Sequence, residues 1–407
     1  MFDFANSAYT TVVITAVYNA YFVATVAERA PHATLAWTLA LSLSYALIML
    51  SAPAIGRYAD RRHAKKKLLL IITVINVLAT LALAYTGPGT VALALGLIVL
   101  SNFAFGTGEN LCAAFLPELA KADSLGRVSG WGWSLGYLGG LFSLGLCLVF
   151  IGWAQARGWT AAEFVPGCMV ITAVSFALGT LPTFLLLRER GHSSRAPGPT
   201  VSTWAHLRQS LQQLRGLPDL FRLLLAIVSY QAGIQTVIVL AAVFAQEALG
   251  FGTQQTIAML FVVNITAALG AFVFGFLQDR LGHRACLSGS LVLWIIAIAV
   301  LALAEGTTAF WIAANLAGLA LGAAQSAGRA LVGFLSPYAQ RAEFFGLWGL
   351  AVKLGSIIGP LSYGLTEYLS GNNHRIAMAM TAVFFVIGLG ILAGLNADRG
   401  RRLVHTV

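Results

Sequence analysis

Long apolar runs recur along this 407-residue chain, and they constrain its fold more than any other feature. Each run is about 20 residues or longer, so one helix could cross the ~30 Å hydrocarbon layer of a membrane. In lipid a helix satisfies its own backbone hydrogen bonds, which favours helices for runs of this length. We expect twelve spans, at residues 4–27, 34–59, 68–87, 90–116, 128–152, 163–187, 222–247, 254–278, 285–304, 307–335, 344–369 and 375–395.

The composition supports this assignment. Hydrophobic residues make up 58% of the chain and charged residues only 10%, whereas a soluble domain carries roughly 25% charged residues. The deficit is spread along the whole chain, so one buried core does not explain it. The expected fold class is therefore all-α, a polytopic membrane protein. The cysteines show no C-x-x-C spacing, and we expect free thiols at Cys112, Cys147, Cys168 and Cys286.

Basic residues alternate between loops, which predicts the topology. They crowd into the loop after the second span (Arg57–Lys67) and into the long loop after the sixth (Arg188–Arg222), while the opposite loops offer only Arg29, Arg157 and Arg375. The positive-inside rule then puts both termini in the cytoplasm, and we expect a cell-membrane location, inner or plasma membrane. The net charge of +10 is thus a topology signal and predicts no nucleic-acid partner. We also expect a short basic segment before Met1.

A duplicated loop divides the chain into two halves. The stretch GRYADRRHAKKK returns 219 residues later as GFLQDRLGHRAC. The repeat predicts two pseudo-symmetric six-helix bundles, at 1–187 and 222–407, with a cytoplasmic linker at 188–221 and a short cytoplasmic tail. The matched positions are Gly56 with Gly275, Asp60 with Asp279, Arg61 with Arg280, His63 with Gly282, and Lys65 with Arg284.

The carboxylates of this repeat suggest a gate. At the end of a helix, Asp60 and Asp279 can pair with a helix N-terminus or with a basic residue of the other half. Such contacts hold one face of a protein closed and must break when that face opens. Glycine permits the close approach of helices. The alternative interpretation is a plain interfacial charge cluster. His63 departs from the pattern, and we expect it to stiffen or reshape the first loop.

The two loops resemble the signature of the major facilitator superfamily. The stretches DFANSAYTTVV (3–13), FLPELA (115–120), YQAGIQTVIVLAAVF (230–244) and AEFFGLWGLAVKLGSIIGP (342–360) resemble its vacuole-effluxer-like branch, which includes a fungal autophagy-related vacuolar amino-acid exporter. The resemblance covers most of the chain. It implies alternating access and proton-linked export of amino acids or similar metabolites. Ala232 stands where an acidic residue is expected before Gly233, which implies altered coupling or specificity.

Polar residues within the spans are candidates for solute contact. Along the first helix Asp3, Ser7, Thr11, Thr15 and Asn19 recur every four residues, and such a row should face a cavity or another helix rather than lipid. Uncharged polar groups suit a small polar or zwitterionic solute; the alternative is hydrogen bonding between helices. The candidates are Asn6, Tyr9, Thr10, Thr11, Gln231, Gln235 and Gln325.

Three charges lie inside spans: Glu109, Arg329 and Lys353. Lys353 is near the middle of its span, where a charge costs about 2.5–3.5 kcal/mol on insertion scales. A carboxylate such as Glu109, a water cavity or an anionic ligand must offset that cost, and loss of the charge is expected to leave stability level or raise it. Asn110 matches Arg329 in the 219-residue register. All four are candidates for binding or coupling; static ion pairs are the alternative.

The sequence favours a secondary transporter over other classes. It contains no Walker loop, G-x-S-x-G elbow or paired-carboxylate site, so we expect no cofactor and a gradient as the driving force. The expected partners are a small-molecule substrate, protons and membrane lipid, with the protein a monomer. Two alternatives remain open, a non-transporting scaffold or receptor on the same fold and a polytopic membrane enzyme. In the linker, Trp204, Leu207, Leu211 and Leu214 predict an amphipathic surface helix or a mere tether.

Overall fold

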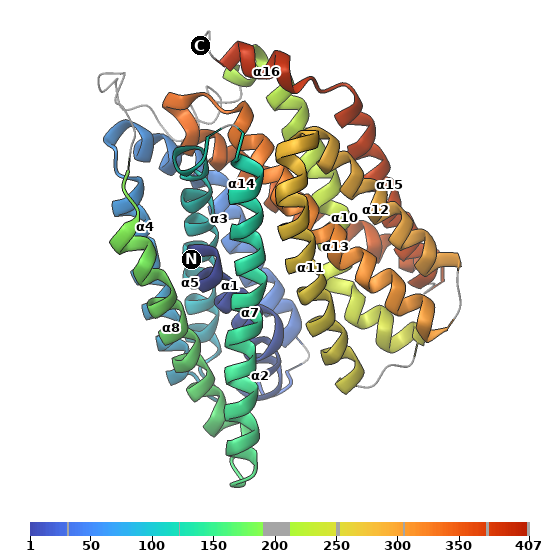
Figure 1. The fold of residues 1–407 in the computed structure, drawn as a ribbon. Helices are drawn as coiled ribbons and strands as arrows, with labels where there is room; N and C mark the ends of the chain where they lie inside the picture. The colour runs from blue at the N-terminus through green and yellow to red at the C-terminus, as the bar shows by residue number, and fades with distance from the viewer. Residues whose placement is uncertain are drawn as a thin grey trace.

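The computed structural model describes residues 1–30, 32–121, 123–189, 212–249, 253–303, 306–371 and 374–404. Within these ranges, twelve helices are long and apolar enough to cross a membrane. The expected all-α polytopic class is confirmed, and the helices that carry the spans begin and end within a few residues of the limits expected from sequence (Figure 1).

The N-terminal half contributes the first six spans. The first is built from four short pieces, and the fourth includes a short helix, α6, after its main one. The elements are α1 (Phe2–Tyr9), η1 (Thr10–Ala16), α2 (Tyr18–Tyr21), η2 (Phe22–Val26), α3 (Ala33–Arg62), α4 (Lys65–Ala82), η3 (Leu83–Tyr85), α5 (Val91–Ala113), α6 (Leu116–Leu119), α7 (Leu125–Gln155) and α8 (Ala161–Leu186).

The C-terminal half contributes the other six spans and a short terminal helix, α16. Its elements are η4 (Leu214–Gly216), α10 (Pro218–Leu249), α11 (Thr253–Leu281), α12 (His283–Leu303), α13 (Thr307–Leu335), η5 (Tyr338–Gln340), α14 (Arg341–Leu369), α15 (His374–Ala393) and α16 (Ala397–Val404). The predicted surface helix lies mostly outside the described residues; Leu214, in η4, is buried. The domain limits stay a prediction, and α10 already begins at Pro218, a residue suited to a first helical turn.

The two halves meet along two pairs of helices. α3 packs against α14, and α7 packs against α11. In the 219-residue register α3 corresponds to α11 and α7 to α14, so these two contacts are related by the internal repeat. α7 also packs against α13, and α5 against α14. Residues 320–333 of α13 are buried without exception, since the small side chains there let neighbouring helices approach from every side.

The first span is not a regular α-helix. η1 and η2 are π-helical, a rare form that is frequent at functional sites. A run of β-branched residues from Thr10 to Thr15 disfavours the α-helix, and the Thr15 hydroxyl donates to the Thr10 carbonyl oxygen (3.0 Å), which competes with the helical ladder. The predicted polar row therefore does not run along one straight α-helix.

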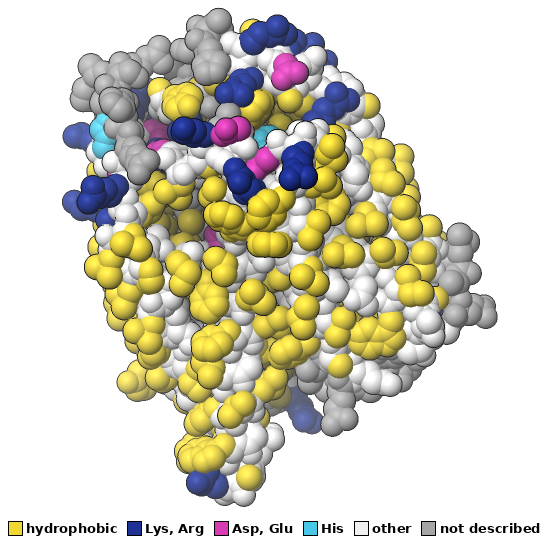
Figure 2. All heavy atoms as spheres, in the orientation of Figure 1, with side chains coloured by type: hydrophobic (Ala, Val, Ile, Leu, Met, Phe, Trp, Pro, Cys, Tyr) yellow, Lys and Arg dark blue, Asp and Glu magenta, His cyan; other side chains and the backbone are white. Residues whose placement is uncertain are grey.

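The two ends of the molecule differ in charge. The end that carries α16 and both described ends of the linker, Glu189 and Gln212, is called the linker face; the other is the opposite face. Figure 2 shows most of the visible Lys and Arg side chains at the linker face, above a broad band of hydrophobic side chains. At the opposite face, the α7–α8 hairpin, with Arg157 in its connecting loop, projects beyond the other helices (Figure 1).

Candidate functional site

The repeated loops hold the two bundles together at the linker face. The Asp279 carboxylate, on α11, accepts hydrogen bonds from the backbone N–H groups of Gly126 (2.9 Å) and Arg127 (3.1 Å) and from Arg127 Nε (3.0 Å). Asp60, on α3, accepts from the backbone N–H of Glu343 (3.1 Å). Each carboxylate therefore caps the first turn of a helix in the other bundle, α7 or α14, where the helix dipole favours negative charge.

The glycines of the repeat allow this contact. A Cβ added at Gly56 would collide with the backbone of Ala342, at the start of α14. A Cβ added at Gly275 would lie 3.1 Å from the Cα of Gly130 in α7, closer than such atoms normally pack. Backbone therefore meets backbone at both crossings, which places each carboxylate within reach of its helix start.

The remaining positions of the repeat do not all act across the interface. Arg61 and Arg280 are exposed. Lys65 is buried and bridges two acids of its own bundle, Asp60 (3.2 Å) and Glu118 of α6. Arg284 instead donates to the last carbonyl groups of α15. Among the residues of the repeated loops, the contacts across the interface thus come from the two aspartates, their glycines and Arg57, whose Nε lies 3.6 Å from Glu343 Oε2 of α14.

His63 does not give the first loop a different turn. Its backbone is left-handed (φ +48°), as is that of its counterpart Gly282 (φ +89°). This conformation costs a non-glycine residue about 1–2 kcal/mol. The two loops therefore share a turn type, and the substitution affects its stability rather than its handedness.

Deeper in the interface, Arg329 of α13 forms an ion pair with Asp3 of α1. Arg329 Nη1 lies 2.8 Å from Asp3 Oδ2. The guanidinium also donates to the Ser129 hydroxyl (3.2 Å) and carbonyl (2.9 Å) on α7, and it lies over the Trp133 ring (5.3 Å). A Cβ added at Gly132 would collide with both members of the pair. Two helices of the N-terminal bundle thus hold one arginine of the C-terminal bundle.

A further ion pair crosses the interface below the linker face, at Lys353. Its Nζ lies 3.9 Å from Glu109 Oε2, 5.1 Å from the centre of the Tyr45 ring and 5.8 Å from that of Phe105. Lys353 is 12 residues into α14 (353 − 341), or about 18 Å along the helix axis. Its side chain is 10% exposed and that of Glu109 22%. The lysine predicted near the membrane midplane therefore faces a carboxylate of the other bundle.

Asn110 adds an uncharged group to this interface. Its carboxamide lies against Gly349 of α14, where an added Cβ would collide with it. Within the described part of the chain, Asn110 Nδ2 is buried without a hydrogen-bond partner. A buried donor of this kind is costly unless something binds it, which suits a residue that contacts a solute.

The other candidate residues divide between the bundles. Gln231 of α10 donates to Gln325 of α13 (2.7 Å), so both belong to a polar contact inside the C-terminal bundle. Tyr9 turns into the N-terminal bundle, where its hydroxyl shares a hydrogen bond with Ser101 (2.7 Å). Thr11 lies against Gly140 of α7. Tyr9 and Thr11 therefore make their contacts away from the two ion pairs. Of the remaining candidates, Asn6 is buried, and Thr10 and Gln235 are half-buried.

The interface is closed toward the linker face. A cavity of about 10 Å³, room for one water molecule, lies between α3, α5 and the start of α14. Its lining includes Gly56, Thr107 and Asn110. Asp3 and Glu109 keep about a fifth of their side chains exposed, and Figure 2 shows an acidic side chain at the bottom of a hollow below the linker face.

Sequence reasoning missed several partners. Asp3 belongs to the predicted polar row but is not among the predicted site residues. The position of Arg329 inside a span is itself a signal, because a charge there needs a partner of opposite sign. Ser129 supplies contacts that carry no sequence signal, because one of them is its backbone carbonyl. Glu118 lies within the FLPELA stretch, and only the structure shows that it pairs with Lys65 beside Asp60.

The family model described as vacuole effluxer Atg22-like matches residues 22–405, which is nearly the whole chain. The chain belongs to this family. The chain is 28% identical over 400 residues to YxiO of Bacillus subtilis, described as an uncharacterized major facilitator-type transporter; the match covers 97% of this chain and 92% of that protein. Autophagy-related protein 22 of Cryptococcus neoformans is 26% identical over 68% of this chain and 51% of its own length.

Solved structures agree on the fold of this Atg22-like protein. The human organic anion transporter MFSD10 superposes with a TM-score of 0.76 at 15% identity, covering 96% of this chain and 97% of that one. FucP in its outward conformation gives a TM-score of 0.73 at 14% identity, covering 97% and 98%. The fold is that of the major facilitator superfamily, and the family assignment makes the protein a secondary transporter.

Proposed function

We propose that this protein exports a small zwitterionic metabolite, such as an α-amino acid, in exchange for or together with protons. The linker face is assigned to the cytoplasm and the protein to the cell membrane, where it works as a monomer with the domain limits predicted from its sequence. The family description as an effluxer supports the direction, and the basic linker face supports the orientation.

One observation carries the proposal: the two ion pairs that cross the bundle interface below the linker face have the same polarity, opposite to that of Arg127–Asp279 and Arg57–Glu343 at the linker face. Both acids, Asp3 and Glu109, come from the N-terminal bundle, and both cations, Arg329 and Lys353, come from the C-terminal bundle. A zwitterion can replace both partners of such a pair, because its carboxylate binds a cation and its ammonium group binds an acid. Asn110 supplies a free amide for a further hydrogen bond.

The ion pairs also suit proton coupling. When the two bundles rock apart, each carboxylate loses its cation and must bind a solute, water or a proton. Asp3 and Glu109 are both partly exposed, so protons can reach them. A proton:xylose symporter, XylE, shares the fold with a TM-score of 0.71 at 17% identity. Because Ala232 stands where an acidic residue is expected, proton coupling in this protein would depend on Asp3 and Glu109.

Solute counterflow in proteoliposomes tests the proposal. Protein-containing vesicles preloaded with an amino-acid mixture should accumulate external labelled amino acid, and protein-free vesicles should not. Derivatives that lack one charge, an N-acetyl amino acid or an amino-acid amide, should exchange at least about tenfold more slowly, since one charge-assisted contact is lost. Equal exchange of singly charged derivatives contradicts the zwitterion assignment. No exchange with any metabolite pool favours the scaffold or receptor alternative.

A further inference from the structure

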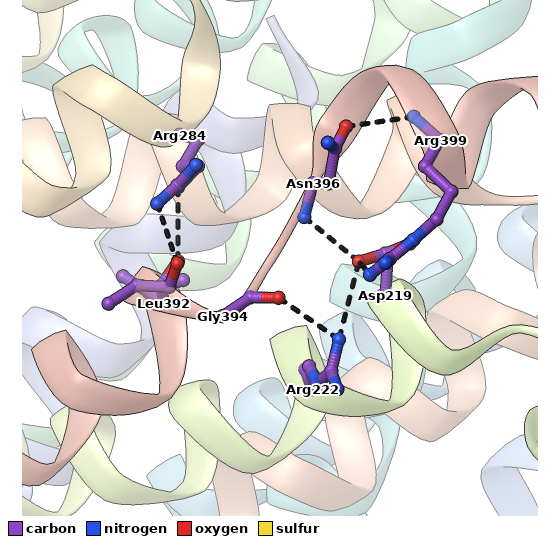
Figure 3. A network of polar contacts seen from close by, with 8 residues as sticks. Asp219, Arg222, Arg284, Leu392, Gly394, Asn396 and Arg399 are labelled. Carbon is purple, nitrogen blue, oxygen red and sulfur yellow. Dashed lines mark hydrogen bonds and ion pairs between the residues drawn. The ribbon is translucent and has the colours of Figure 1, made fainter.

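A cluster of arginines lies at the linker face of the C-terminal bundle, away from the interface between bundles. Arg222 is on α10, Arg284 on α12 and Arg399 on α16, and all three surround the C-terminal end of α15 (Figure 3). We call these three residues the arginine cluster. None of the three belongs to the ion pairs or the carboxylate contacts described above.

The cluster contains one buried acid, Asp219, and Arg399 donates hydrogen bonds to both of its carboxylate oxygens. Asp219, whose side chain is fully buried, accepts from Arg399 Nε (2.8 Å) and Nη2 (2.6 Å) and from the backbone N–H of Asn396 (2.9 Å). Arg222 Nη1 is farther from the same carboxylate, at 3.9 Å. Asp219 and Arg399 therefore neutralise each other in a bidentate ion pair that anchors α16.

The other two arginines bind backbone carbonyls. Arg222 Nη1 donates to the Gly394 carbonyl (3.0 Å), and Arg284 donates to those of Leu392 (3.0 Å) and Ala393 (2.9 Å). A helix C-terminus carries only about half a negative charge. Three guanidinium groups against one carboxylate and one helix end leave about +1.5 charge (3 − 1 − 0.5) among these groups.

This excess charge lies at the edge of the hydrophobic band. Arg222 is the fifth residue of its membrane-spanning helix (222 − 218 = 4), Arg284 the second of its own, and the carbonyls belong to the last residues of α15 and the residue that follows. Arg222 is flanked on α10 by Phe221 and Leu225, which are 45% and 44% exposed. Partly exposed guanidinium groups thus adjoin apolar side chains that face outward, at the depth of lipid headgroups.

We propose that the arginine cluster binds the phosphate of an anionic phospholipid in the leaflet at the linker face, with the acyl chains against Phe221 and Leu225. Planar guanidinium forks match phosphate oxygens, and basic pockets between membrane helices bind anionic headgroups. The lipid completes the charge balance at the point where α10, α12, α15 and α16 meet. It therefore braces the C-terminal bundle without touching the gate.

Native mass spectrometry and thermal melting of the purified full chain in detergent test this site. We expect phosphatidylglycerol to bind more tightly than phosphatidylcholine of the same chains and to raise the melting temperature. The double variant Arg222→Gln/Arg284→Gln should bind phosphatidylglycerol at least about tenfold more weakly, because charged contacts are lost. Arg402→Gln is the matched control: it removes one exposed charge from α16, outside the cluster, and should leave the affinity unchanged.

Three results would overturn the proposal. The double variant could keep the wild-type affinity, the Arg402 control could lose as much as the double variant, or inorganic phosphate could stabilise the protein as well as the lipid does. If the double variant does not fold, Arg222→Gln alone is measured, since Arg284 still caps α15. The binding measurement does not depend on transport, so its outcome is separate from that of the proposed function.

Discussion

Replacement of Arg329 by methionine is expected to abolish solute flux and to lower the free energy of unfolding by about 3–5 kcal/mol, because the Asp3 carboxylate is left buried without its cation. Asp3→Asn is expected to abolish flux and also to lower stability, because it leaves the Arg329 guanidinium, whose side chain is 6% exposed, without its acid. In that variant Arg329 keeps its contacts with Ser129 and Trp133, while the charge that must switch partners is gone. Counterflow in proteoliposomes and melting in detergent measure the two effects.

Flux, rather than stability, separates transport from packing in these two variants. Arg157→Met serves as the control, since this arginine stacks on Trp153 at the opposite face (3.7 Å to the ring centre) and should leave flux unchanged. Wild-type flux in Asp3→Asn would mean that the pair only stabilises the contact between α1 and α13.

Lys353→Met is expected to abolish flux as well, and Lys353→Arg to leave part of it, since arginine keeps the charge but places it differently. The sequence alone suggests that the methionine variant is as stable as the wild type or more stable. With Glu109 at 3.9 Å, the single change instead leaves a carboxylate unpaired, so we now expect a loss of stability. The double variant Lys353→Met/Glu109→Gln should regain stability while flux stays absent.

Flux and melting temperature decide between the two roles of this pair. Normal flux in Lys353→Met would remove the lysine from the site. Recovery of both flux and stability in the double variant would make the pair a structural contact. Lys67→Met is the control, because this lysine is exposed at the linker face and contributes to neither ion pair.

The fold could be predicted from the sequence because the membrane imposes a length on each helix. The twelve apolar runs and the 219-residue repeat are enough for the all-α two-bundle architecture. The contacts of the repeated loops were also predictable, since Asp60 and Asp279 end helices beside glycines, and the structure places both on helix starts of the other half.

The pairing of charges inside the membrane was only partly predictable. Glu109 was a predicted partner for Lys353 because both are charges within spans. Asp3 as the partner of Arg329 was not, because helix packing and the π-helical distortion of the first span decide where Asp3 points. The same holds for Tyr9: its place in the polar row does not reveal that its hydroxyl binds Ser101 inside one bundle.

Two distances, measured between spin labels in the reconstituted protein, test most directly the claim that the bundles rock and that the repeated carboxylates hold the linker face closed. After replacement of the native cysteines, one label pair joins Arg62 to Leu281, repeat counterparts exposed at the linker face, and the other joins Tyr85 to Tyr368, exposed at the opposite face.

Asp60→Asn/Asp279→Asn should lengthen the Arg62–Leu281 distance and shorten the Tyr85–Tyr368 distance, and flux should fall. Asp279→Asn alone should have the larger effect of the two single changes, since Asp279 accepts three hydrogen bonds from the other bundle. Unchanged distances at both faces, or an increase at both, would contradict the account.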